Sequence, residues 1–157
     1  MKRTVLYPGI AATSAMTLFS YLISALRDEN FREPRVLSVL VKRLLSDDFS
    51  HTLKKGAIPA GWAIHYSVGF LFTAIYDRLW RYPSSKPTIT RGALLGFVSG
   101  ICGVIGWYIT LQLHPCPPEK NLKNYFRHLI VAHIVFGIFA LLAYRSIKSS
   151  RRLNITV

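Results

Sequence analysis

The chain has 157 residues, of which 51% are hydrophobic, and it carries 20 Lys and Arg against 7 Asp and Glu. This composition is too apolar for an ordinary soluble domain. The positive charge lies in short segments that flank apolar runs, which is typical of a membrane protein and argues against nucleic acid as a partner. We therefore expect one integral membrane domain over residues 1–157.

Four apolar runs are long enough, or nearly so, to cross a hydrocarbon core of about 30 Å, which takes about 20 helical residues. The first run follows Lys2 and Arg3 as in a signal peptide, but it is long and no Ala-x-Ala site precedes Arg27, so we expect it to be retained. The fold class is thus an all-α, four-helix membrane bundle. The predicted membrane helices cover residues 4–26, 57–80, 92–113 and 125–144.

A shorter amphipathic helix is predicted over residues 34–45, with Glu33 before it and Pro34 at its first position. It is too short to span a membrane, and we expect it to lie on the bilayer or against the bundle. Its apolar face is Leu37, Leu40, Val41 and Leu44, and its polar face is Arg35, Ser38 and Lys42.

The second and third membrane helices are joined by a short loop at 81–91 with two prolines, which predicts an antiparallel hairpin. The third helix also carries a doubled GxxxG pattern, which lets another backbone or a flat ligand approach closely. Of these two interpretations of the glycine pattern, we favour close packing against another helix. Cys102 is expected to pack there as a small apolar residue and cannot pair with Cys116, which lies beyond the helix end. The glycines are Gly92, Gly96, Gly100, Gly103 and Gly106.

The topology is not decided by charge, since ten Lys and Arg lie on each side of the predicted bundle. We expect both termini in the cytoplasm, because the segments on the opposite side mix their basic residues with acidic ones. The expected location is a bacterial inner membrane. The expected partners are the lipid bilayer and a larger membrane complex or a homo-oligomer.

Two of the membrane helices share a His–Gly–Tyr spacing. In each, Gly follows His by four residues and Tyr follows Gly by seven, offsets that fall on one helix face. The two helices run in the same direction, so the histidines are predicted to face one another at the same depth. The two sets are His65, Gly69 and Tyr76 in the second helix, and His133, Gly137 and Tyr144 in the fourth.

An imidazole within an apolar span is a candidate for function. The helix directions place His51, His114 and His128 toward the same membrane face as the central pair. Haem b would take His65 and His133 as axial ligands, with room made by Gly69 and Gly137. A divalent metal or a proton or quinone site are alternatives, as are histidines acting as hydrogen-bonded struts between helices. The candidate metal ligands are His65, His133, His128, His114 and Glu33.

No GxSxG, HExxH, P-loop or desaturase-type histidine box is present, so the sequence leaves open whether the protein is an enzyme. The first helix has no histidine, which argues against a four-helix di-haem cytochrome. Our leading hypothesis is a small membrane protein that binds haem or a metal at a histidine-lined site near one membrane face. Its role would be in electron transfer or complex assembly. The alternatives are an accessory subunit of a larger complex, and a small transporter or lipid-modifying protein.

Overall fold

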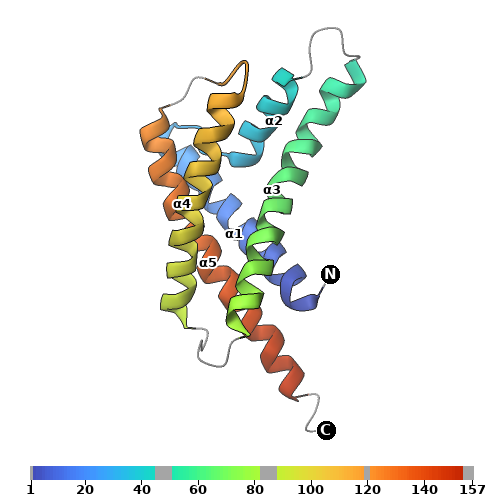
Figure 1. Cartoon of the computed structure of the whole chain (residues 1–157), viewed down its shortest axis with the longest axis vertical. Helices are drawn as coiled ribbons and strands as arrows, with labels where there is room; N and C mark the ends of the chain where they lie inside the picture. The colour runs from blue at the N-terminus through green and yellow to red at the C-terminus, as the bar shows by residue number, and fades with distance from the viewer. Residues whose placement is uncertain (1, 45–50, 82–87, 119–120, 154–157) are drawn as a thin grey trace.

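The computed structural model describes residues 2–44, 51–81, 88–118 and 121–153, with the backbone alone for 51–55 and 150–153. The described residues are helical and contain no strand, which confirms the all-α prediction. Figure 1 shows the arrangement. The five helices are α1 (Arg3–Arg27), α2 (Glu33–Leu44), α3 (His51–Trp80), α4 (Ile89–Leu113) and α5 (Leu122–Leu153).

Four of these helices are long and apolar enough to cross a membrane, over Arg3–Arg27, Gly56–Trp80, Ile89–Leu113 and Leu122–Ser149. The predicted bounds hold for α1 and α4 to within a turn. The predicted membrane helices at 57–80 and 125–144 lie within the corresponding spans, but the helices themselves are longer, since α3 begins at His51 and α5 continues to Leu153. The physical reason is that Lys and Arg end an apolar span but are good helix formers, so the helix runs on through them.

The helices pack in the order α4–α5–α1–α3–α2, an open arrangement with α4 at one end and α3 with α2 at the other. Figure 1 shows α3 and α4 on opposite sides of the view. The predicted antiparallel hairpin of α3 and α4 is therefore wrong as a packed pair. Instead, the small-residue face of α4 is turned toward α5, and α3 packs on α1 and α2.

The glycines of α4 divide into two groups. A Cβ added at Gly96 would collide with the carbonyl oxygen of His133 and lie 2.8 Å from the Cα of Ile134, and one at Gly100 would lie 3.0 Å from the Cα of Ile130. Close packing of α4 on α5 is thus confirmed at these positions. At Gly106, by contrast, an added Cβ would meet no other described residue within 4 Å.

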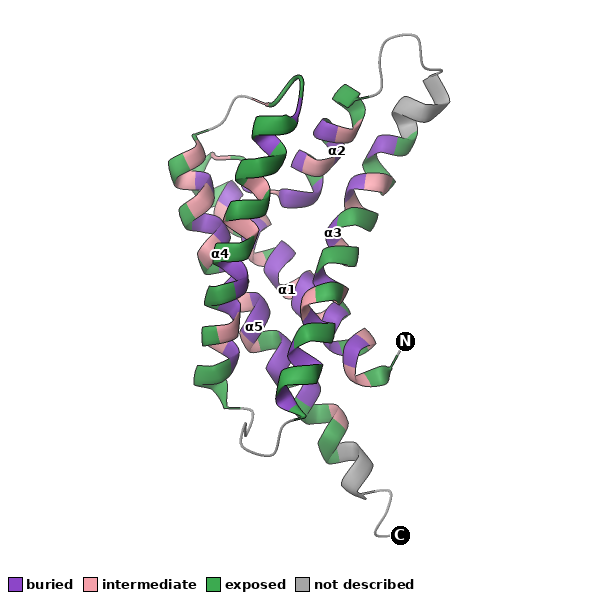
Figure 2. Ribbon diagram, viewed as in Figure 1, coloured by how far each residue is buried: buried purple, intermediate pink, exposed green. Residues whose placement is uncertain are grey.

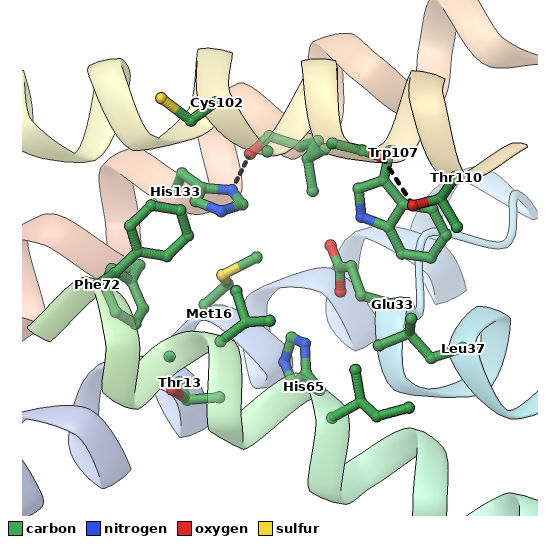
Figure 3. Close-up of a pocket in the computed structure, with 17 residues that line it drawn as sticks. Thr13, Met16, Glu33, Leu37, His65, Phe72, Cys102, Trp107, Thr110 and His133 are labelled. Carbon is green, nitrogen blue, oxygen red and sulfur yellow. Dashed lines mark hydrogen bonds between the residues drawn. The ribbon is translucent and has the colours of Figure 1, made fainter. Parts of the chain in front are cut away.

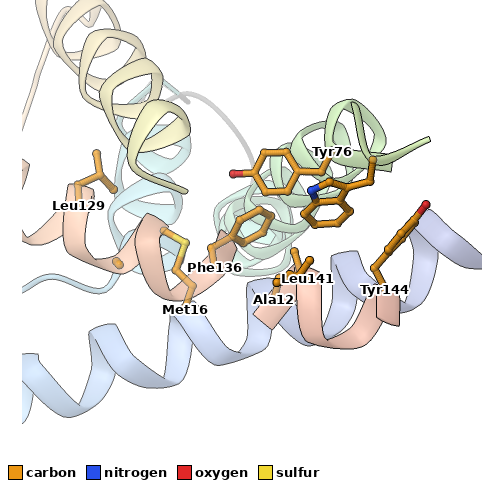
Figure 4. Close-up of a cluster of buried hydrophobic side chains, with 10 residues drawn as sticks. Ala12, Met16, Tyr76, Leu129, Phe136, Leu141 and Tyr144 are labelled. Carbon is orange, nitrogen blue, oxygen red and sulfur yellow. The ribbon is translucent and has the colours of Figure 1, made fainter. Parts of the chain in front are cut away.

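An apolar core joins α1, α3 and α5, and both tyrosines of the His–Gly–Tyr repeat lie in it, as Figure 4 shows. The outward surface is apolar too: Leu18 is 72% exposed and Leu113 is 80% exposed. Figure 2 shows exposed residues recurring along α3 and α4. The buried core residues are Ala12, Met16, Tyr76, Trp80, Leu129, Ala132, Phe136, Ala140, Leu141 and Tyr144.

The amphipathic helix α2 lies against the bundle, packed on α3. Its predicted faces are partly wrong. Ser38, assigned to the polar face, is buried, and its single hydroxyl hydrogen is shared between the carbonyls of Pro34 (2.7 Å) and Ile58 (3.2 Å). The reason is close approach: Gly61 of α3 lies directly opposite, where an added Cβ would collide with Ser38. A larger side chain at either position would separate the two helices.

Candidate functional site

A cavity of about 290 Å³ lies between α3 and α4, with α1 and α5 behind it and the start of α2 at one end (Figure 3). Most of its wall is apolar or aromatic, and the remainder includes imidazole, carboxyl, hydroxyl and thiol groups. The lining residues are Thr13, Met16, Glu33, Leu37, Ile64, His65, Val68, Gly69, Phe72, Cys102, Gly103, Gly106, Trp107, Thr110, Leu129, His133 and Phe136.

His65 enters the cavity from α3 and is 8% exposed. Its Nε2 lies 2.9 Å from the hydroxyl oxygen of Thr17, and that hydroxyl donates its own hydrogen to the carbonyl of Thr13 at 2.7 Å. Because a hydroxyl has one hydrogen, Nε2 of His65 must be the donor in the first bond. The Nδ1 of a neutral His65 is therefore an acceptor, and no hydrogen bond within the described structure uses it.

His133 enters the same cavity from α5 and is 6% exposed. Its Nδ1 donates to the carbonyl of Leu129, one turn earlier, at 2.8 Å. Its Nε2 is then the acceptor nitrogen of a neutral ring. This edge of the ring faces α4, since a Cβ added at Gly103 would lie 3.2 Å from Nε2. The ring is held edge-on by Phe72, with centroids 5.8 Å apart.

The structure thus brings the predicted pair, His65 and His133, onto one cavity. They lie at similar depth, about 14 Å and 17 Å along the apolar spans that begin at Gly56 and Leu122. The two glycines of the repeat differ. Gly69 lines the cavity but is packed against Thr13 of α1, and Gly137 is packed against the backbone of α4 and does not line the cavity.

Glu33 reaches the cavity from the first turn of α2 and is 1% exposed. Its Oε1 accepts a hydrogen bond from the Ser20 hydroxyl at 3.0 Å. Since that hydroxyl is already a donor, the Nε2 of His128 donates to Ser20 at 2.9 Å, and it lies 3.9 Å from Oε1. The His128 ring is stacked between Phe19 and Phe31. His128 therefore lies behind Glu33 and outside the cavity.

The remaining predicted histidines lie elsewhere. Nε2 of His114 donates to the carbonyl of Leu40 at 3.1 Å, and its Nδ1 accepts from the amide of Cys116 at 3.1 Å. Nε2 thus connects the end of α4 to α2, and Nδ1 is used locally, so both ring nitrogens of His114 are occupied. The side chain of His51 lies outside the described residues.

Sequence reasoning missed the hydroxyl residues of α1. Four of them recur at helical spacing on one buried face. Thr17 is the partner of His65, and Ser20 is the partner of both His128 and Glu33. This spacing is visible in the sequence, but hydroxyls also occur as small packing residues in membrane helices, which conceals their role. Cys102, expected in the packed core, is instead exposed and lines the cavity. The hydroxyl residues are Thr13, Thr17, Ser20 and Ser24.

The described side chains contain no group of three or more His, Cys, Asp or Glu that could hold a metal ion. The predicted ligands are instead distributed over the cavity, the Ser20 network and the tie between α2 and α4. The glycines expected to make room for a macrocycle, Gly69 and Gly137, are occupied by helix contacts. Metal or haem binding is therefore not supported.

The chain was compared with protein-family models, with characterised proteins and with solved structures, and none of the three comparisons gives a match.

Proposed function

We propose that this protein is an integral membrane protein whose cavity binds a lipid-soluble molecule with hydrogen-bond donors at its polar end, such as the hydroxyl groups of a quinol. One observation carries the proposal: His65 and His133 both line the same apolar cavity, and each uses one ring nitrogen within the protein, which leaves one acceptor nitrogen on each neutral ring. A ligand with donors matches this set, whereas a ligand with acceptors alone does not.

Membrane residence is supported by the four apolar helices and by large apolar side chains on their outward faces. An even number of spans would place both termini on one side, which we propose is the cytoplasmic side of a bacterial inner membrane. In this setting the acceptor nitrogens are well inside the apolar span. A donor there is bound without competition from bulk water, so the hydrogen bonds discriminate strongly in favour of hydroxylated molecules.

The size and wall of the cavity also fit such a ligand. Small-molecule sites are typically about 300–1,000 Å³, mostly apolar, with a few polar groups that fix orientation. A cavity of about 290 Å³ is at the low end of this range and suits a single substituted ring. Phe72, Trp107 and Phe136 offer aromatic surfaces against which such a ring could pack.

The test measures binding of a methylated hydroquinone to the purified protein in lipid nanodiscs. Binding is detected by quenching of the fluorescence of Trp107 and the other tryptophans. His65→Ala and His133→Ala each remove one acceptor, so each should weaken binding by about 1 kcal/mol, roughly fivefold. His114→Ala is the matched control, because both nitrogens of His114 are used outside the cavity. Circular dichroism checks that every variant is folded.

Equal affinity of all three variants and the unchanged protein would refute the proposal, as would the absence of binding. An absorption spectrum and elemental analysis of the same preparation test the haem and metal hypotheses. A Soret band or a stoichiometric metal that both cavity variants lose would favour those hypotheses instead.

A further inference from the structure

The cavity continues to the outer surface between α3 and α4. Ile64 and Val68 form its edge on α3, Cys102 and Gly106 form its edge on α4, and all four are exposed. We call this edge the α3–α4 window. It exists because α3 and α4 are not a packed pair, and because nothing described fills the space beside Gly106.

Above the window, hydrogen bonds connect α2 to the segment that follows α4. Nε2 of His114 donates to the carbonyl of Leu40 at 3.1 Å. The guanidinium of Arg43 donates to the carbonyls of Cys116 (3.1 Å) and Pro117 (2.9 Å). These bonds lie across the end of the bundle where α2 is drawn in Figure 1. They favour the lateral route over entry from the water-facing end.

Below the window, α3 and α4 are joined by a buried hydrogen bond between the hydroxyls of Tyr76 and Ser99, at 2.7 Å. The window is thus a lateral opening with a lower limit at this bond. Its edge on α3 is formed by Ile64 and Val68, within the span Gly56–Trp80. In a bilayer, this opening faces hydrocarbon rather than water.

We infer that the ligand is a chain-bearing lipid that enters through the α3–α4 window, with its hydroxylated ring in the cavity and its hydrocarbon chain left between α3 and α4. The inference rests on the proposed function and deepens it by naming the class of molecule. A cavity of about 290 Å³ is at the lower limit for a whole small ligand, so a ring fills it and a long chain must remain outside. The exposed apolar side chains of the window match such a chain.

Cys102 provides a reporter, because it lies on the window and the chain has only one other cysteine, Cys116. In a Cys116→Ser variant in nanodiscs, the rate of alkylation of Cys102 by N-ethylmaleimide is measured with two probes. One is a methylated hydroquinone with a decyl chain, and the other is the same ring without the chain. With each probe at about ten times its own Kd, the chain-bearing probe should slow alkylation about tenfold. The chainless probe should slow it less, because its ring covers Cys102 only from the cavity and leaves the outer side of the window open.

The matched control carries Cys102→Ser, Cys116→Ser and Ile109→Cys. Ile109 is exposed on α4 but does not line the cavity, so neither probe should protect a cysteine there. If the chain-bearing probe binds and leaves Cys102 fully reactive, the window is not the route and the inference fails while the proposed function stands. If neither probe binds, both fail. A disulfide-linked dimer through Cys102 that excludes the probe would show that a second copy covers the window, which also refutes the inference.

Discussion

The sharpest prediction concerns the contact of α4 with α5 and compares Gly96→Ala with Gly106→Ala. The two substitutions add the same methyl group to the same helix, so their effect on intrinsic helix propensity is the same and cancels in the comparison. They differ in surroundings. At Gly96 the new Cβ would collide with the carbonyl oxygen of His133 and lie 2.8 Å from the Cα of Ile134, whereas at Gly106 it would meet no other described residue within 4 Å.

The magnitude follows from these contacts. Ordinary contacts between carbon atoms are about 3.5–4.0 Å, so α4 and α5 would have to separate by about 1 Å to admit a methyl group at Gly96. The atoms in the way belong to the α5 backbone and cannot rotate aside as a side chain would. Overpacking of this kind typically costs about 1–3 kcal/mol. We therefore expect the free energy of unfolding of Gly96→Ala to be about 1–3 kcal/mol lower than that of Gly106→Ala.

The assay is titration of each variant in mixed micelles with sodium dodecyl sulfate, with unfolding followed by circular dichroism. Gly96→Leu extends the series, because a branched side chain would force the helices further apart and should lower the stability again. If Gly96→Ala and Gly106→Ala unfold at the same detergent fraction, α5 does not approach Gly96 as the structure has it. The packing order of the helices would then have to be revised.

Two further predictions concern buried hydroxyl groups. Ser20→Ala removes the group between Glu33 and His128 and should lower the free energy of unfolding by about 1–3 kcal/mol, measured by the same titration; no change would show that these two side chains do not depend on Ser20. Tyr76→Phe and Ser99→Ala should each lower the free energy of unfolding by about 0.5–1.5 kcal/mol. The double variant should lose clearly less than the sum of the two, because both substitutions remove the same hydrogen bond. Additive losses would contradict that bond.

The periodicity of the sequence predicts much of the fold. Four apolar runs and a short amphipathic segment give the five helices of the described residues, and the glycine spacing of 92, 96 and 100 predicts the face of α4 that meets α5. The helix ends were predicted less well at α3 and α5, because an apolar window detects the span and not the charged turns that extend it. The polar face of α2 was predicted incorrectly at Ser38, which is buried because α2 approaches Gly61 of α3 closely. The polarity of a side chain does not indicate such a contact.

The relation of α3 to α4 could not be read from the chain. A short connection predicts antiparallel neighbours, yet here the two helices stand apart and a cavity lies between them. What separates them is the choice of partner: α4 uses its glycines on α5, and α3 uses Gly61 on α2 and Gly69 on α1. Both choices depend on which small residues meet across helices distant in sequence, and the individual motifs do not specify their partners.

The candidate site was anticipated in part. The repeated His–Gly–Tyr spacing places His65 and His133 on inward faces at similar depth, and both do line one cavity. Their available nitrogens depend on two different kinds of contact. The hydrogen bond from His133 to the Leu129 carbonyl joins residues one helical turn apart, so it can be inferred from the sequence of α5 alone. The hydrogen bond from His65 to Thr17 joins α3 to α1 and is known only from the fold.

The glycine repeat of α4 and the histidine of α5 together explain why a cavity exists at this position. If glycine spacing alone governed the contact, the α5 backbone would follow α4 from Gly92 as far as Gly106. Instead, backbone atoms of α5 meet Gly96 and Gly100, and the imidazole of His133 meets Gly103. At Gly106, a Cβ would have no neighbour within 4 Å from another part of the described structure. The ring thus stands where the two helices diverge. The same side chain lines the cavity, which connects the packing of α4 on α5 to the site where we propose that a lipid-soluble donor binds.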